Sequence, residues 1–225
     1  METPANQSLR GERVGRFDSE REDMVALLQD RGVTDGRILH AMATVERHAF
    51  IPEPFTNRAY EDSALPIGAG QTISQPFTVA FMTQCLGVRP GDKVLEVGTG
   101  SGYQAAVLAA LGVRVFSIER NLELLAVARK VLDRFGYRVV SKGGDGSIGW
   151  QEFSPYNGII VTAAAPDVPQ PLLKQLADGG KLVIPVGSRE VQTLLVVSRS
   201  GDRYDRREIE SFKFVPLIGK MGWGQ

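Results

Sequence analysis

The chain has 225 residues, with 26 basic and 26 acidic side chains and a formal net charge of zero. This length fits one large α/β domain or, less well, two small ones, and 43% hydrophobic with 23% charged residues is typical of a packed globular protein, not of a disordered or fibrous one. Zero net charge argues against a nucleic-acid partner, one cysteine excludes an internal disulfide, and two histidines make a metal site improbable, so no metal is expected.

The N-terminal part of the chain is predicted to be helical and irregular. Residues 1–18 are polar and predict a loose tail, too polar for a secretion signal. Apolar residues recur at helical spacing over 19–31, and a second helix is predicted over 35–46. Residues 48–75 carry prolines and glycines without a sustained period, and so long a loop in a compact domain is more often functional than idle. No apolar run is long enough to span a bilayer, so we expect a cytoplasmic protein with no membrane partner.

After residue 90 strands and helices alternate. The expected strands are residues 93–97, 113–119, 138–140, 158–161 and 181–186. Helices are expected over 103–111, from Asn121 to Gly136, and from a proline-rich start to Leu176. Such alternation predicts a Rossmann-like, mostly parallel doubly wound sheet with helices on both faces. We expect one domain over 19–225, in which residues 19–90 form a helical and loop cap and residues 91–225 a ligand-binding α/β core.

The end of the chain breaks the parallel pattern. Only about four residues separate the fifth strand from the apolar run 193–197, which is too short for a parallel crossover. A Ser-Gly-Asp turn at 200–202 then leads into another extended stretch that ends at residue 217. We therefore expect an antiparallel C-terminal hairpin.

The most informative motif is EVGTGSGY at residues 96–103, between a strand and a helix. Glycines there let the backbone pass close to a ligand. A dinucleotide site requires G-x-G-x-x-G, but here the third glycine comes one residue early and Tyr103 follows it. Glycines at this spacing after an acidic strand residue look instead like the S-adenosyl-L-methionine (SAM) site of a methyltransferase. The predicted SAM-binding residues of this motif are Glu96, Gly98, Thr99, Gly100 and Gly102.

Two further acidic positions extend this site. Glu119 ends the second strand, where its carboxylate can accept hydrogen bonds from ribose hydroxyls; an acidic residue favoured by the helix dipole is the alternative. Asp145 and Gly146 follow the third strand, where an adenine edge could meet a carboxylate or a backbone N–H, although residues 143–146 could also be merely a turn.

Several segments resemble the protein-L-isoaspartate O-methyltransferase family. They are DSALPIGAGQTISQP (62–76), the glycine motif, GDGSIGW (144–150), YNGIIVTAAAPDVP (156–169), KLVIPVG (181–187) and FVPLIG (214–219). The resemblance runs from about residue 19 to the end; the N-terminal tail looks like an addition, and Ala69 stands where bacterial relatives often carry histidine. It implies methyl transfer from SAM to the α-carboxylate of isoaspartyl residues in damaged proteins and peptides, leaving S-adenosyl-L-homocysteine (SAH). The ester then closes to a succinimide, which begins repair.

The resemblance assigns the active-site serine of the family to Ser74. Its hydroxyl would either donate a hydrogen bond to the substrate carboxylate or hold the loop against it. A serine followed by Gln-Pro is also a good helix N-cap, and the catalytic and capping roles are compatible. Thr72, Ile73 and Ser74 are expected to line the cofactor, and Val79 either touches it or packs in the core. The substrate is expected to contact residues that follow the fourth predicted strand and end the fifth. An ordinary loop without a binding role is an equal alternative for these residues, which are Ala163, Ala164, Ala165, Pro166, Pro185 and Val186.

The chemistry agrees with the scarcity of histidine. A carboxylate is already ionised at neutral pH, because its pKa lies near 4, so its methylation requires no general base. The alternatives are a SAM methyltransferase for another substrate, which would require a base or a basic face, an NAD-dependent oxidoreductase, and a non-catalytic SAM-binding protein. We expect a monomer, because nothing in the sequence suggests an interface.

Overall fold

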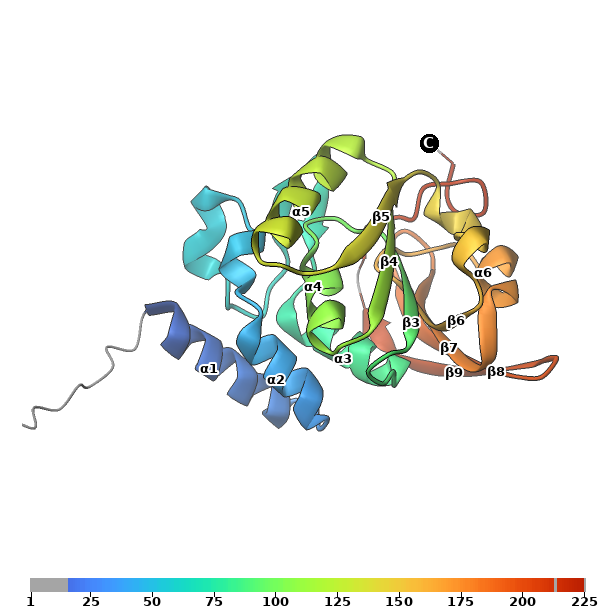
Figure 1. Ribbon diagram of the computed structural model, residues 1–225, viewed down its shortest axis with the longest axis horizontal. Helices are drawn as coiled ribbons and strands as arrows, with labels where there is room; N and C mark the ends of the chain where they lie inside the picture. Colours follow the sequence, from blue (N-terminus) through green and yellow to red (C-terminus); the bar gives the residue numbers. More distant parts are fainter. Residues whose placement is uncertain (1–15, 213, 225) are drawn as a thin grey trace, which may run out of the picture.

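A single twisted sheet of seven strands forms the centre of the molecule (Figure 1). Residues 16–212 and 214–224 are described in the computed structural model of the chain, so residues 1–15 of the predicted tail lie outside the described residues. The strand order is β5-β4-β3-β6-β7-β8-β9. The strands are β3 (Lys93–Val97), β4 (Arg114–Glu119), β5 (Val139–Gly143), β6 (Tyr156–Val161), β7 (Leu176–Gly187), β8 (Gln192–Ser200) and β9 (Arg203–Phe212).

The direction of the strands confirms the predicted architecture. The pairs among β3, β4, β5, β6 and β7 are parallel, whereas β8 pairs antiparallel with both β7 and β9. The short connection between β7 and β8 allows only this antiparallel return. The sheet is therefore a Rossmann-like methyltransferase sheet with an antiparallel C-terminal end.

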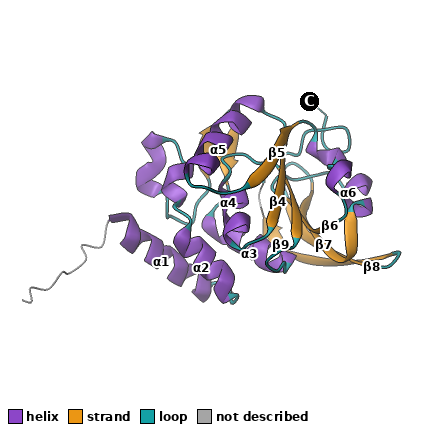
Figure 2. Ribbon diagram, in the orientation of Figure 1, coloured by secondary structure: helices purple, strands orange, loops and turns teal. Residues whose placement is uncertain are grey.

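The two faces of the sheet are buried against different elements. Successive strand residues point to opposite faces, so Val94 belongs to one apolar cluster and Leu95 to the other. The first cluster includes residues of α3 (Pro76–Leu86) and α4 (Tyr103–Ala110), and the second includes α6 (Gln170–Lys174). Figure 2 shows the helices on both sides of the strands, as predicted.

Two of the predicted helices start at side-chain caps. Helix α2 (Gly36–Thr44) begins after Asp35, whose side chain accepts the Arg37 N–H. Helix α5 (Leu122–Arg134) begins after Asn121, whose side chain accepts two backbone N–H groups of the first turn. Asp and Asn are preferred N-caps because their oxygens satisfy donors that the helix leaves unpaired.

The structure corrects several boundaries. The last strand ends at Phe212, not at residue 217, and β5 runs to Gly143, beyond the predicted residue 140. Helix α1 (Arg16–Asp30) begins at Arg16, inside the predicted tail. Helix α6 ends at Lys174, and β7 already begins at Leu176, where the sequence pattern predicted the end of a helix and a strand only from residue 181. Leu176 pairs with Tyr156 of β6 before the register shifts, so strand pairing, not local helical propensity, determines this stretch.

The N-terminal helices share the core of the sheet. Residues of α1 and α2 belong to the same apolar cluster as residues of β3 and α4. Met42 of α2 accepts a weak hydrogen bond from the hydroxyl of Tyr103 in α4, and the guanidinium of buried Arg47 lies over the Tyr103 ring, 4.8 Å from its centroid. None of the helices among the described residues is long and apolar enough to cross a membrane.

The segment predicted as a long loop contains short regular elements. It folds into two 3₁₀ turns, η1 (Arg47–Phe50) and η2 (Glu53–Arg58), and a hairpin of β1 (Leu65–Gly68) and β2 (Gln71–Ile73). Three consecutive residues with positive φ form the hairpin turn: Gly68, Ala69 and Gly70. Ala69 is the only described non-glycine residue with a positive φ, at 50°. The second strand of the hairpin, β2, leads into α3 after two residues.

Candidate active site

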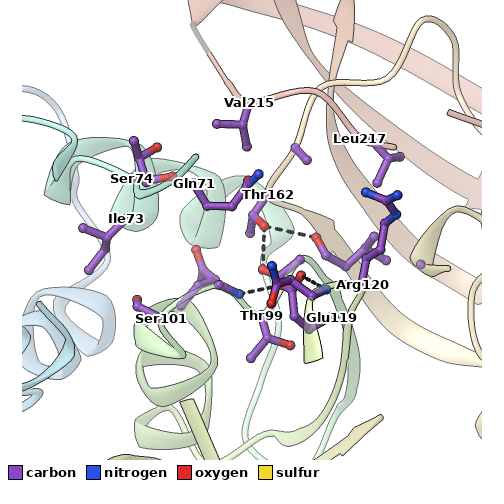
Figure 3. Close-up of a pocket in the computed structure, with 18 of the residues that line it drawn as sticks. Gln71, Ile73, Ser74, Thr99, Ser101, Glu119, Arg120, Thr162, Val215 and Leu217 are labelled. Atoms are coloured by element: carbon purple, nitrogen blue, oxygen red, sulfur yellow. Dashed lines mark hydrogen bonds between the residues drawn. The ribbon is translucent and has the colours of Figure 1, made fainter. Parts of the chain in front are cut away.

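A cavity of about 580 Å³ opens at the carboxyl ends of β3, β4 and β6. This edge is where open α/β sheets bind ligands. Three segments close it: the glycine turn after β3, the end of the hairpin with the start of α3, and residues 215–218 near the end of the chain. Figure 3 shows Ile73 and Ser74 on one side of the cavity and Glu119 and Arg120 on the other.

The glycine turn fits tightly against the end of β6. A Cβ on Gly98 would lie 2.4 Å from the Thr162 Oγ1, and its φ of +97° is one that other residues rarely adopt. The Thr162 hydroxyl donates to two carbonyls where β3 meets the turn, 2.7 Å from Gly98 O and 3.1 Å from Val97 O (Figure 3). Thr162 therefore fixes the backbone of the turn, and only glycine fits at position 98.

The Glu119 carboxylate is held by backbone donors on both oxygens. One oxygen accepts the Gly100 N–H at 2.9 Å, and the other accepts the Asn121 N–H at 2.8 Å. Each carboxylate oxygen has a second lone pair for a ligand hydroxyl. The side chain is 8% exposed and lines the cavity, so Glu119 is a preorganised acceptor at the position predicted for ribose recognition.

Glu96 lies beneath the turn and does not line the cavity. Its carboxyl is fully buried and accepts a short hydrogen bond from the Ser117 hydroxyl, which in turn contacts the Thr99 hydroxyl at 2.5 Å. Burial raises the pKa of Glu96 to about 8, the Ser117 bond opposes this rise, and the nearby Glu119 adds to it. Glu96 is therefore protonated at neutral pH, and it supports Thr99 through Ser117 without facing the ligand space.

Ser74 is not the N-cap of α3, which corrects one of its two predicted roles. The helix begins at Pro76 after Gln75, and the Gln75 side chain makes no capping bond. Asp62 instead accepts the Phe77 N–H at 2.8 Å. Ser74 lines the cavity, and its hydroxyl has no hydrogen-bond partner among the described residues.

Asp145 points away from the cavity toward the C-terminal segment. One oxygen accepts the N–H and the hydroxyl of Ser147, and the other accepts the Lys220 N–H at 2.7 Å. Burial alone would raise the pKa of this carboxyl, but the bonds from Lys220 and Ser147 keep it below its ordinary value. Asp145 thus anchors the segment after residue 218, and only the neighbouring Gly146 lines the cavity.

The predicted substrate wall is largely covered by the chain itself. Ala164 donates its N–H to Val215 O and accepts from Leu217 N and from the Trp223 ring nitrogen. Ala165 bonds in the same way to the end of β7, at Pro185 O and Gly187 N. The backbone groups of these two residues are thus occupied and the residues are at most 2% exposed, and their contact with a substrate peptide stays a prediction.

The cavity brings together ten of the predicted residues. They are Thr72, Ile73, Ser74, Val79, Gly98, Thr99, Gly100, Glu119, Gly146 and Ala163. Those that do not line it are Glu96, Gly102, Asp145, Ala164, Ala165, Pro166, Pro185 and Val186. Gly102 has a packing reason, because a Cβ there would lie 3.3 Å from side-chain carbons of α5.

Several lining residues are absent from the sequence-based prediction. They include Gln71, Ser101, Gln104, Arg120, Thr162 and residues 215–218. The motif at residues 214–219 was a signal for the last group, but nothing local indicates that this segment returns to lie beside Ala164. No group of three metal-ligating side chains is present in residues 16–212 and 214–224.

Comparisons with known proteins agree on one family. The model of the protein-L-isoaspartate(D-aspartate) O-methyltransferase family matches residues 19–222. Proteins named protein-L-isoaspartate O-methyltransferase from Salinibacter ruber and Methanoregula boonei are each 53% identical to the chain, over 90% and 91% of its length and 93% and 95% of theirs.

Two solved structures have the same fold. A protein-L-isoaspartate O-methyltransferase structure superposes with a TM-score of 0.82 at 29% identity, covering 90% of this chain and 67% of that one. A putative family member from Plasmodium falciparum, in complex with SAH, gives a TM-score of 0.78 at 24% identity, over 88% of this chain and 98% of that one.

Proposed function

Because this chain belongs to the protein-L-isoaspartate(D-aspartate) O-methyltransferase family, we propose that its cavity holds SAM against the sheet edge and the substrate carboxylate beside Ser74. The enzyme transfers a methyl group from SAM to isoaspartyl residues of proteins, which begins their repair. The observation that supports the residue assignment is the Ser74 hydroxyl, which lines the cavity without a protein partner, opposite the glycine turn and Glu119.

The residues present fit SAM. Gly98 lines the cavity in a turn that packs directly on Thr162, where a Cβ would not fit, and Glu119 offers lone pairs to ribose hydroxyls. Thr72, Ile73 and Val79 supply the facing side from the hairpin and α3. When bound, SAM supplies an electrophilic methyl group; the protein binds it, orients it and excludes water.

The substrate carboxylate requires orientation but no proton transfer. A carboxylate is ionised at neutral pH, and no histidine lines the cavity in the described part of the chain. The Ser74 hydroxyl can donate to one carboxylate oxygen and leave the other to attack. Alignment of two bound reactants can lower a barrier by roughly 7–11 kcal/mol, so positioning by Ser74 is sufficient as its role.

For the protein as a whole, we propose a single-domain monomer over residues 19–225 that works in the cytoplasm without nucleic acid. The core shared between the N-terminal helices and the sheet supports a single domain. Zero net charge supports the absence of a nucleic-acid partner, and a buried free cysteine supports the reducing environment of the cytoplasm. Light scattering coupled to size exclusion tests the oligomeric state, and a stable dimer would contradict it.

A labelled-methyl assay tests the reaction. The protein is incubated with methyl-labelled SAM and an isoaspartyl peptide, or with the same peptide carrying a normal aspartate. We expect alkali-labile label in the first peptide only. Label in neither would refute the activity, and equal label in both would refute the specificity.

The Ser74→Ala variant tests the residue assignment. We expect kcat to fall by about 10- to 100-fold, as for a misoriented reactant, while the Kd for SAH stays within about twofold. Ser101→Ala is the matched control, since Ser101 lines the same cavity from the glycine turn; it should change SAH affinity more than kcat. Equal loss of turnover and SAH binding in Ser74→Ala would make Ser74 a structural residue.

A further inference from the structure

The start of α3 is capped by a residue from a distant part of the chain. Pro76 has no N–H to offer, Gln75 makes no side-chain capping bond, and the Phe77 N–H is bound by Asp62, fifteen residues earlier. This N–H is at the second helical position, which an N-cap side chain normally satisfies. Asp62 thus performs the capping that the sequence pattern assigned to Ser74.

Asp62 is itself held in place. Its second oxygen is paired with the Arg31 guanidinium, and its side chain is 11% exposed. The same guanidinium lies over the Phe77 ring, with its carbon 3.7 Å from the ring centroid. The three side chains form a clamp on the first turn of α3, and Arg31 offsets the negative charge that Asp62 would otherwise place near an anionic substrate.

An unbound Phe77 N–H would compete for the Ser74 hydroxyl. Serine is among the preferred N-cap residues, and proline is tolerated in the first turn. Without Asp62, this N–H would be an unbound donor three residues after Ser74, at the spacing at which a capping serine accepts. Ser74 could accept it only if Gln75 left its extended conformation before Pro76, which is a cost that the bond to Asp62 avoids. The hydroxyl would then bond to the helix and leave the cavity.

We propose that Asp62 is a positioning residue for catalysis, which satisfies the first turn of α3 so that the Ser74 hydroxyl remains free for the substrate carboxylate. This inference rests on the proposed role of Ser74. It assigns Asp62 no contact with substrate or SAM. Asp62 acts on the position of the Ser74 hydroxyl, so its loss should lower kcat and leave the Kd for SAH unchanged.

Three variants test the proposal. Asp62→Ala removes the acceptor and should lower kcat by about 10- to 100-fold, with the Kd for SAH within about twofold. Asp62→Asn keeps an oxygen that can accept the Phe77 N–H and should recover most of this loss. Asp35→Ala removes the equivalent cap of α2, outside the cavity, and should lower the thermal midpoint while leaving kcat unchanged.

A double-mutant cycle separates this inference from the role of Ser74. If Asp62 acts through Ser74, Asp62→Ala should cause no further loss of kcat in a Ser74→Ala background. Losses that multiply in the double variant, or an Asp62→Ala enzyme at the wild-type kcat beside a slow Ser74→Ala enzyme, would overturn the inference alone. A Ser74→Ala enzyme at the wild-type kcat would overturn the proposed role of Ser74 first.

A milder variant covers the case in which Asp62→Ala does not fold. Arg31→Met leaves the capping oxygen in place but removes its charged partner, so we expect a smaller loss of kcat that is again absent in the Ser74→Ala background. Hydrogen exchange at the Phe77 amide should be faster in Arg31→Met than in the parent enzyme. Unchanged exchange and unchanged kcat in this variant would contradict the clamp.

Discussion

The two sides of the cavity use their polar side chains in different ways. At the sheet edge, Glu119 binds two backbone N–H groups, Thr162 binds two carbonyls and Thr99 contacts Ser117. On the side formed by the hairpin and α3, the Ser74 hydroxyl has no partner in the described part of the chain. The first side keeps its shape through the protein's own bonds, and the second leaves unbound the hydroxyl that we propose for the substrate. Changes at the sheet edge should therefore alter stability and SAH affinity, whereas changes at Ser74 should alter turnover.

The largest effect is expected from Gly98→Ala. A Cβ at this φ of +97° collides with the Thr162 hydroxyl, so the turn must move or the Thr162 bonds must break. We expect a loss of about 2–4 kcal/mol in the free energy of unfolding and no measurable SAH binding by calorimetry. Gly136→Ala is the control, since its φ is +72° with no atom near the new Cβ; it should lose about 1 kcal/mol and bind SAH normally. Similar SAH binding in both variants would show that the turn tolerates a side chain.

Glu96→Gln tests the buried support beneath the turn through pH. Between the ordinary pKa of 4.5 and the raised value of about 8, folded Glu96 keeps a proton that the unfolded chain has lost. Its contribution to stability therefore falls as pH rises through this window and levels off above it. Relative to Glu96→Gln, the wild-type protein should lose on the order of a few kcal/mol of stability between pH 5 and pH 8. Parallel curves of unfolding free energy against pH would mean that Glu96 does not hold this proton.

Glu119→Gln tests whether the preorganised acceptor binds the ligand. The amide keeps the size of the side chain but turns one acceptor into a donor that faces a backbone N–H. We expect the Kd for SAH to rise by about 10- to 100-fold, as for the loss of a hydrogen bond to a charged group, with kcat at saturating SAM much less affected. Glu190→Gln, on the exposed turn between β7 and β8, should leave the Kd unchanged. A fall in kcat without a change in Kd would move Glu119 to the catalytic step.

Asp145→Asn should have the smallest effect. It weakens the anchor on Lys220 and Ser147 that holds the C-terminal segment over the cavity. Loss of about 1 kcal/mol should speed SAH dissociation by about fivefold in stopped-flow measurements. Asp178→Asn alters a similar bond, from the Gly201 N–H at the far end of the sheet, and should not change this rate. An equal effect of both variants would point to a general loss of stability.

What could be predicted from the sequence is what depends on local pattern. The strand at 93–97 and the Asn121 cap were predicted correctly, because burial period and capping chemistry act over a few residues. The positions of Gly98 and Glu119 at one sheet edge follow from parallel strand geometry. Half of the cavity is therefore visible in the sequence.

The other half depends on contacts between distant segments. Asp62 replaces the expected serine cap, the return of residues 215–218 covers Ala164, and Asp145 binds Lys220. In each case the local pattern predicted one interaction for a residue, and the structure shows a contact with a distant segment of the chain instead. Local propensity does not say which of two acceptors reaches a given N–H.

The apolar cluster shared by α1, α2 and the sheet has a consequence for which side of the cavity yields first. Residues of α1, α2 and α3 all belong to this cluster, whereas no described residue of α1 or α2 lines the cavity. The helix behind Ser74 therefore packs in the same core as the N-terminal helices. Heating or denaturant that loosens α1 or α2 should disturb this side before it disturbs the glycine turn.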